Sequence, residues 1–451
     1  MSTKYPRVKH QVIIRETRIG DYLLSGDSVL KIEDMGRKVV EWCDGSHTVS
    51  EIAQWAAEME GEPVETVRKE LEEFLDTLVE EGVITYIDSP EKDPLPAIYQ
   101  YDRPLSVIWE ITYACNQNCK YCIAKAGKPD PHELTEEEIN TVLDELVDLR
   151  VGLINITGGE PVLKKDTALY IARKASERGI ELELLTNAML MTPDTAQAFS
   201  DAGVRHAQVS VDCARPEIHD DQRGIKGSWE RAVAGIKNLR EAGIEVMAAS
   251  VMNSETITYF EETRTFLGSI ADVLKMGPVM PMGRGENHAC LLTPDMYFEL
   301  LKLRNKTDDN QLTDFIFCKE RCSIGTTPVI APNGNVYPCM LTKYEELKLG
   351  NVRESSLRDI YKNSHVLKEL FECRVDKIET CRDCWNRYYC GGGCRGCAFA
   401  YHQTIYKKDS YQCEARKKFA RALLRQGHPS TKKALKELLK LTRKSKEESH
   451  G

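Results

Sequence analysis

The run ITYACNQNCKYCIAK carries Cys115, Cys119 and Cys122 as a CxxxCxxC triplet with no fourth cysteine beside it. Three thiolates on one loop can hold three irons of a four-iron cluster and leave the fourth iron open to another ligand. A zinc ion with three protein ligands and one open position is the alternative. The triplet therefore predicts a metal site that binds and activates a further molecule.

A glycine-rich turn follows the next apolar run of the chain. Gly158, Gly159, Glu160 and Pro161 come directly after VGLINIT. Two adjacent glycines let the backbone approach a ligand closely, and Glu160 offers a carboxylate to a cationic group. This turn and the triplet each follow an apolar strand, so we expect both at the same end of one sheet.

Together these motifs resemble the radical S-adenosylmethionine (SAM) superfamily, whose open iron binds the amino and carboxylate groups of SAM. The resemblance implies that the triplet holds the catalytic cluster, which splits SAM into a 5′-deoxyadenosyl radical. It also implies that the turn of Gly158 to Pro161 binds the methionine amino group. Further SAM contacts are expected from Tyr121 near the adenine, and from Asn187, Ser210, Asp212 and Arg223. Taken singly, Asp212 could instead cap a turn and Arg223 could form a surface ion pair.

The elements that must position these residues are strands alternating with amphipathic helices, from Leu105 to about residue 305. Six βα units predict an α/β fold, a partial (β/α)6 TIM barrel assigned to residues 96–305, with chemistry at the carboxyl ends of the strands. Asn187, Asn253 and Met276 end later strands and are expected at the same mouth. The six strands are LSVIWEIT, VGLINIT, IELELLT, HAQVSVD, IEVMAASV and DVLKMGP.

A second set of cysteines follows the barrel, and the run CRDCWNRYYCGGGC spells CxxCxxxxxCxxxC. It resembles the SPASM domain of peptide-modifying radical SAM enzymes, here assigned to residues 306–428. The resemblance implies two auxiliary four-iron clusters, although CxxC pairs also occur in zinc ribbons. The first would be held by Cys318, Cys322, Cys339 and Cys394, and the second by Cys381, Cys384, Cys390 and Cys413. Cys318 is the doubtful ligand, and without it the first cluster would keep an open iron.

One departure narrows the substrate. In the sulfatase-maturing branch of this family an aspartate that serves as a base follows the cysteine at the position of Cys339, whereas here Met340 follows. Oxidation of a serine or cysteine side chain to formylglycine is therefore disfavoured.

The first 95 residues form a separate predicted domain. Short β-like runs, QVIIRE, DYLLS and SVLKIE, precede three helices, and the linker SPEKDPLPA follows them. This order suggests a winged helix-turn-helix. DNA binding is disfavoured because the third helix, from Pro63 to Glu81, is strongly acidic and would repel phosphates.

This segment resembles the peptide-recognition element related to the peptide chaperone of pyrroloquinoline quinone biosynthesis. In that family a leader peptide adds as a strand beside the third strand and rests against the third helix. The corresponding groove would lie between Val29, Leu30 and Lys31 and the helix face of Val67 and Leu71. These apolar residues could equally belong to the core.

Composition limits the other possibilities. The net charge of −9 over 451 residues disfavours a nucleic-acid binder. No apolar run is long enough to span a membrane and no secretory core opens the chain, so we expect a cytoplasmic protein without membrane contact. The basic segment 429–451 predicts a solvated helical tail.

The resemblances imply a radical SAM oxidoreductase that modifies a ribosomally made precursor peptide through a thioether or carbon–carbon crosslink. They imply SAM and three 4Fe–4S clusters as cofactors, with the precursor's leader and core, and an electron donor such as flavodoxin or ferredoxin, as partners. A tetrapyrrole-modifying enzyme and a non-enzymatic multi-cluster electron carrier remain as alternatives.

Overall fold

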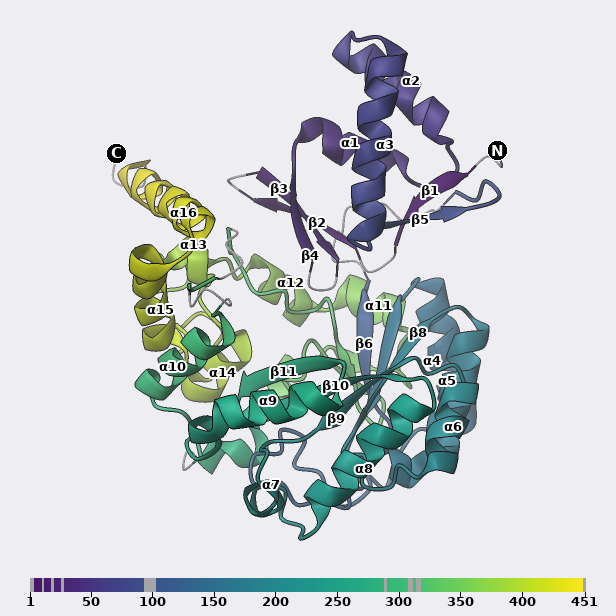
Figure 1. Cartoon of the computed structure of the whole chain (residues 1–451), viewed down its shortest axis with the longest axis vertical. Helices are drawn as coiled ribbons and strands as arrows, with labels where there is room; N and C mark the ends of the chain where they lie inside the picture. Colours follow the sequence, from purple (N-terminus) through teal and green to yellow (C-terminus); the bar gives the residue numbers. More distant parts are fainter. Residues whose placement is uncertain are drawn as a thin grey trace. The chain divides into compact units, whose positions relative to one another are not determined.

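The computed structural model describes residues 4–9, 12–17, 20–25, 28–92, 103–287, 290–306, 311–313 and 318–448 (Figure 1). The chain divides into two compact units, Met1–Leu105 with Arg150–Gly152, and Ser106–Leu149 with Leu153–Gly451. The predicted boundary near residue 95 lies outside the described residues. The boundaries near residues 305 and 428 both fall inside the second unit and stay predictions.

The first unit contains two small antiparallel sheets and three helices. One sheet has the order β2-β3-β4, and the other pairs β1 with β5, a strand pair whose first member the sequence did not predict. A capping box opens the second helix, since Thr48 and Glu51 bond to each other's backbone N–H at 3.2 and 2.7 Å. The elements are β1 (Tyr5–Val8), β2 (Ile13–Thr17), β3 (Gly20–Ser25), β4 (Ser28–Ile32), α1 (Asp34–Trp42), α2 (Val49–Glu60), α3 (Val64–Glu80) and β5 (Ile84–Ile87). The winged-helix comparison stays a prediction.

The second unit is built on six parallel strands in the order β11-β10-β9-β8-β7-β6. This confirms the predicted α/β class and the six-stranded partial barrel. Buried residues alternate along β7 to β10, as in Leu182 and Leu184 of β8, and helices cover the outer side of the sheet (Figure 1). The strands are β6 (Ser106–Glu110), β7 (Leu153–Thr157), β8 (Glu181–Thr186), β9 (His206–Ser210), β10 (Glu245–Met252) and β11 (Val273–Pro278). The helices are α4 (Glu136–Asp148), η1 (Pro161–Lys164), α5 (Lys165–Glu177), α6 (Pro193–Asp201), α7 (Pro216–Arg223), α8 (Ser228–Glu241), η2 (Thr256–Tyr259), α9 (Phe260–Ile270) and η3 (Gly283–Asn287).

The same sheet continues into the cysteine-rich region. β12 (Val329–Ile330) pairs parallel with β6, and β13 (Asn335–Tyr337) and β14 (Gly350–Asn351) follow antiparallel. The sheet therefore has nine strands, and the loop that carries Cys339 follows β13, which only β12 separates from the first barrel strand. The sequence did not predict this extension.

Short helices make up the rest of the cysteine-rich region. They are α10 (Pro294–Arg304), η4 (Glu345–Leu347), α11 (Leu357–Asn363), α12 (His365–Glu372), η5 (Val375–Lys377), α13 (Arg387–Cys390), α14 (Arg395–His402), α15 (Cys413–Gln426) and α16 (Pro429–Glu448). The expectation that the basic C-terminal helix is solvated was wrong along one face. Leu435 and Leu438 of α16 are buried, and α16 packs against α13 and α15. Within the described residues, no helix is long and apolar enough to cross a membrane.

Candidate functional site

A cavity of about 250 Å³ lies at the carboxyl ends of the barrel strands and opens to solvent. Its wall contains all three triplet cysteines. Of the residues expected to contact SAM, it also contains Tyr121, Gly158, Gly159, Asn187, Ser210 and Arg223. The other three, Glu160, Pro161 and Asp212, are buried. The structure thus gathers both sequence motifs at one mouth of the barrel.

The triplet loop is held by backbone contacts from several other loops. Asn118 N donates to Arg223 O at 3.0 Å, and Cys115 N donates to Gly127 O at 3.2 Å. Arg284 donates from Nε to Cys119 O at 2.7 Å and from Nη1 to Ala126 O at 2.8 Å. Protein groups outside the triplet therefore hold the loop on which the three cysteines lie.

Arg284 is a residue that sequence reasoning missed. It lies just after β11, and its backbone N also donates to Cys122 O at 2.9 Å. The neighbouring Gly283 has φ 61°, and a Cβ there would overlap the carbonyl oxygens of the triplet loop. A Gly-Arg-Gly run directly after the last barrel strand was the available signal.

The glycine turn packs directly on the chain leading to the triplet. Gly159 N donates to Thr112 O at 2.7 Å, and Glu160 N donates to Ala114 O at 2.8 Å. A Cβ at Gly158 would overlap Thr112 O, and one at Gly159 would overlap Ala114 O. Glycine is therefore required here for contact between two protein segments as well as for approach to a ligand.

The structure gives Glu160 a different environment from the one expected. The side chain is 1% exposed, and its carboxylate accepts from Val162 N at 3.0 Å, Thr186 Oγ1 at 2.7 Å and Asn187 N at 2.8 Å. Burial raises the pKa of Glu160, and these three donors oppose that rise. The carboxylate thus fixes the turn to the end of β8, and a SAM amino group there would meet backbone atoms of the turn.

Asp212 and Arg223 form a buried ion pair, which corrects both single-residue alternatives. Arg223 Nε and Nη2 lie 2.7 and 2.8 Å from the two carboxylate oxygens of Asp212, which also accepts from Tyr121 Oη. Burial favours the neutral acid, but the Arg223 charge outweighs it and lowers the pKa of Asp212. Arg223 reaches the cavity wall and lies 3.9 Å from Cys119 Sγ through Nη1. Asp212 therefore does not line the cavity itself, but it holds Arg223 and Tyr121, which do.

His219 completes this buried group. Its Nδ1 accepts a hydrogen bond from Asp212 N at 3.1 Å. Burial and then the Arg223 charge lower the pKa of His219 to about 4, so the imidazole is neutral near pH 7. The buried group of Asp212, Arg223 and His219 therefore has no net charge near pH 7.

The three strand-end residues Asn187, Asn253 and Met276, all expected at the mouth of the barrel, have different outcomes. Asn187 lines the cavity and donates from Nδ2 to Asn116 Oδ1 at 2.7 Å. Asn253 instead donates to Gln222 Oε1 at 2.7 Å inside the protein, and Met276 packs in a hydrophobic core. The strand-end rule thus located only the first of these three at the mouth.

The four cysteines predicted to hold the second auxiliary cluster lie together in the structure. Cys381, Cys384, Cys390 and Cys413 line one enclosed space of about 20 Å³. Asn386, 1% exposed, lines the same space, and its Oδ1 and Nδ2 have no hydrogen-bond partner among the described residues. Unpaired buried polar atoms beside four thiols fit a site that a polar group fills.

The first auxiliary set is partly grouped. Burial and then the Cys394 thiol raise the pKa of Cys322, and burial together with these two thiols raises the pKa of Cys339, so the three thiols lie close together. Cys318 is buried at 1% exposure. Its membership of the set stays a prediction.

The cysteine geometry bears on the choice between iron and zinc. Among the described residues, no three His, Cys, Asp or Glu side chains converge closely enough to hold a single metal ion. A four-iron cluster spreads its ligands over several corners and accepts wider spacing. Burial also raises the pKa of the Cys115 thiol to about 11, so a thiolate there needs a bound cation. The three cysteine groups fit clusters better than zinc.

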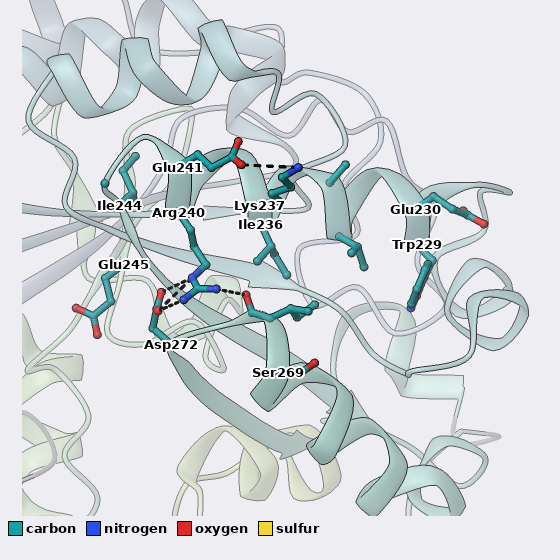
Figure 2. Close-up of a pocket in the computed structure, with 14 residues that line it drawn as sticks. Trp229, Glu230, Ile236, Lys237, Arg240, Glu241, Ile244, Glu245, Ser269 and Asp272 are labelled. Atoms are coloured by element: carbon teal, nitrogen blue, oxygen red, sulfur yellow. Dashed lines mark hydrogen bonds and ion pairs between the residues drawn. The ribbon is translucent and has the colours of Figure 1, made fainter.

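A second and larger cavity of this unit lies elsewhere, at the amino ends of β10 and β11 between α8 and α9 (Figure 2). Its charged residues already bond to one another: Arg240 pairs with Asp272 at 2.9 Å, and Lys237 with Glu241 at 3.7 Å. It contains none of the cysteines. Size alone would therefore have misplaced the site.

The predicted leader groove is only partly supported by the first unit. Val67 and Leu71 are 6% and 4% exposed and belong to the core, which is the alternative that the sequence left open. On β4, Leu30 is partly buried and Lys31 is exposed, and the side chain of Val29 lies outside the described residues. The outer edge of β4 pairs with no other strand in the described chain.

Three family models match the chain. The radical SAM superfamily matches residues 109–267, the SPASM iron–sulfur cluster-binding domain matches 322–385, and coenzyme PQQ synthesis protein D (PqqD) matches 22–84. They fall on the barrel, the cysteine-rich region and the first unit.

Relatives share the same central region. Mycofactocin maturase MftC of Mycobacterium tuberculosis is 28% identical over 316 residues, which is 66% of this chain and 80% of the relative. AdoMet-dependent heme synthase of Methanosarcina barkeri is 28% identical over 344 residues, 69% of this chain and 96% of the relative.

Streptococcus suis SuiB, solved with S-adenosylmethionine, has the same fold with a TM-score of 0.61 at 14% identity, over 90% of this chain and 99% of its own. The cavity fits SAM, and the cysteine groups fit iron–sulfur clusters. The chain therefore carries a radical SAM domain, a SPASM domain and a PqqD domain, and it is a radical SAM enzyme.

Proposed function

We propose that this enzyme modifies a ribosomally made precursor peptide and joins two of its groups through a thioether or carbon–carbon bond. The supporting observation is that a PqqD domain occurs in the same chain as a SAM-type cavity whose wall includes Met340, the neighbour of Cys339. MftC is a maturase, and SuiB has been solved with its precursor peptide SuiA. A cavity shared by both cysteine regions suits a substrate that meets both.

Three 4Fe–4S clusters are proposed, one on the triplet and two on the later cysteines. When bound, SAM and the triplet cluster would supply a 5′-deoxyadenosyl radical that removes hydrogen from a peptide carbon. Tyr121, Asn187, Ser210 and Arg223 would orient SAM from the cavity wall. Gly158 and Gly159 leave room for its methionine end beside the triplet.

The leader is proposed to add as a strand at the edge of β4. Leu30 and Lys31 would contact it, and Phe74 of α3, partly buried on the same core, replaces Val67 and Leu71 as the helix contact. The core of the peptide would then enter the barrel cavity.

Flavodoxin or ferredoxin is the proposed electron donor, and the cytoplasm is the proposed compartment. None of the sixteen cysteines forms a disulfide, which suits a reducing compartment.

The test uses the full-length enzyme, reconstituted without oxygen, with SAM, a reductant and candidate precursor peptides encoded beside its gene. We expect 5′-deoxyadenosine and a peptide mass lower by two hydrogens per crosslink. The same peptide without its leader should react at least tenfold more slowly. SAM cleavage with no change in mass or stereochemistry of any leader-bearing peptide would contradict the proposal.

The match to heme synthase supports a second candidate, modification of a tetrapyrrole side chain. That reaction gives the PqqD domain no task. Turnover of a tetrapyrrole at a rate comparable to that of a leader-bearing peptide would favour it.

A further inference from the structure

An acid–base cluster lies on the cavity wall and has no role in holding SAM. Glu110 ends β6, and its two carboxylate oxygens lie 2.8 and 2.6 Å from Lys343 Nζ. Tyr113 Oη donates to the same carboxylate at 3.1 Å, and Lys343 Nζ lies 4.7 Å from the centre of the Tyr113 ring. The side chains of Glu110 and Lys343 are only 7% and 15% exposed. A buried carboxylate is thus held in one orientation by two donors.

The sheet extension explains why these residues meet. Because β12 pairs with β6 and the chain then turns through β13, the loop after Cys339 returns to the end of β6. Met340 on this loop lines the cavity, and Lys343 on the same loop pairs with Glu110. The cluster therefore joins the SAM cavity to the loop of an auxiliary cysteine.

Among the described residues of the cavity wall, Glu110 is the one carboxylate. Arg223 and Arg284 stay protonated and cannot accept a proton. The triplet cysteines are assigned to a cluster, and the Tyr121 hydroxyl already bonds to Asp212. Met340 carries no ionisable group. A proton released by the substrate inside the cavity therefore has one acceptor on this wall.

The reaction proposed above requires such an acceptor. When a C–H and an X–H group become a C–X bond, the hydrogen on carbon leaves as an atom and becomes part of 5′-deoxyadenosine. The hydrogen on X leaves as a proton, and the remaining electron passes to an oxidised iron–sulfur centre acting as a one-electron acceptor. The atoms and charge then balance.

We propose that Glu110 is the catalytic base that accepts this proton, and that Lys343 and Tyr113 are its positioning residues; this inference rests on the proposed function. Lys343 has a third N–H beyond the two that face Glu110, and it is partly exposed, so it provides a path to water.

The test compares Glu110→Gln with the wild-type enzyme. Glutamine keeps an oxygen acceptor for Lys343 and Tyr113 but cannot act as a base. We expect two properties to persist in the variant. One is the shift that SAM causes in the electron paramagnetic resonance spectrum of the reduced protein, and the other is deuterium transfer from labelled peptide into 5′-deoxyadenosine. Crosslinked peptide formed per 5′-deoxyadenosine should fall about a hundredfold, the usual loss for a missing general base.

Two further variants separate chemistry from structure. Glu110→Ala should regain crosslinking when formate is added, because a small acid can take the vacated position. Glu183→Gln, a partly buried barrel carboxylate outside the cavity wall, should keep the wild-type ratio.

Loss of the SAM-induced shift in Glu110→Gln, or an unchanged crosslink ratio, would overturn the role of Glu110 alone. A wild-type enzyme that makes no crosslink on any leader-bearing peptide would instead overturn the proposed function.

Discussion

The triplet region and the Cys381 region both gather cysteines, but they differ in access. Cys115, Cys119 and Cys122 line a cavity of about 250 Å³ that opens to solvent. The set that includes Cys381 lines an enclosed space of about 20 Å³. The first arrangement is open to small molecules from solvent, whereas the second is closed around its four thiols. This difference in access suits the proposed roles, which are substrate chemistry at the triplet and electron storage or transfer at the later cysteines.

The two regions also differ in how they neutralise a buried arginine. Arg223 is paired with the Asp212 carboxylate. Arg395, 1% exposed, donates to carbonyl oxygens of Gly392, Ile405 and Lys407, and its Nε has no partner among the described residues. Its charge acts on the buried Asp409 carboxylate and on the thiols of Cys322, Cys373 and Cys381, and not on one ion-pair partner alone. The buried arginine of the cysteine-rich region therefore lies among candidate cluster ligands.

The largest effect is expected from replacing one cysteine in each of the two regions, which tests whether they differ in function as they differ in access. Cys119→Ala should abolish SAM cleavage, because the triplet would lose a cluster ligand. Cys384→Ala should leave SAM cleavage within about tenfold of wild type while stopping crosslink formation. The measurement is 5′-deoxyadenosine per enzyme in reconstituted, reduced protein. Equal losses in both variants would remove the distinction between the regions.

Breaking the neutral pair near the triplet should have the next largest effect. Arg223→Met leaves Asp212 buried without its partner and should destabilise the protein by about 3–5 kcal/mol at pH 8. The control Arg264→Met, from an exposed ion pair with Glu261, should cost less than about 1 kcal/mol. Thermal and denaturant unfolding under anaerobic conditions would measure both.

The difference in stability between Arg223→Met and the wild type should depend on pH in a definite direction. In the wild type the pKa of Asp212 is lowered, so the stability due to the ion pair is present above the unfolded pKa and lost only as the pH falls through the folded one. In Arg223→Met, burial is left to raise the pKa of Asp212. The gap between variant and wild type should therefore narrow as the pH is lowered from 8 to 5, and a constant gap would contradict this.

A smaller effect is expected from the glycine turn. Gly159→Ala forces a Cβ into Ala114 O and should cost about 1–3 kcal/mol, with weaker SAM binding. Gly127→Ala is the matched control, because a Cβ there meets no atom within 4 Å. Calorimetric titration with SAM would compare them, and equal affinities would show that the turn adjusts freely.

The smallest effect would sharpen the contrast between the two arginines. Arg395→Met removes a positive charge near Cys322 and Cys381, and should make the auxiliary reduction potentials more negative while the potential of the triplet cluster stays unchanged. Redox titration followed by electron paramagnetic resonance would resolve the centres. A shift of the triplet cluster instead would reverse the expected assignment.

The sequence was sufficient where local patterns carry the information. Alternating apolar runs predicted all six barrel strands within a few residues of their ends, and the resemblance carried by the cysteine motif predicted the set of Cys381 and its three partners. The short strands β12 to β14 have too few residues to show a period. The Glu110–Lys343 pair joins residues 233 positions apart, which no local pattern encodes.

Other differences come from burial, which a motif does not contain. Glu160 has the same sequence context whether it faces a ligand or supports a turn, and only the fold shows the three donors around it. The basic residues of α16 suggested a solvated helix, although Leu435 and Leu438 already formed an apolar stripe. In both cases the tertiary partner decided the role.

The continuous nine-stranded sheet has a mechanical consequence. Because β12 bonds to β6 along the backbone, the loop of Cys339 cannot swing away from the barrel as a hinged domain would. In the proposed function, the path for an electron between the cavity and that loop would be set by strand register, and its length would be the same in every turnover. A chimera that takes its cysteine-rich region from a relative must therefore include β12 to β14. Without these strands the edge of β6 in the recipient barrel would be exposed.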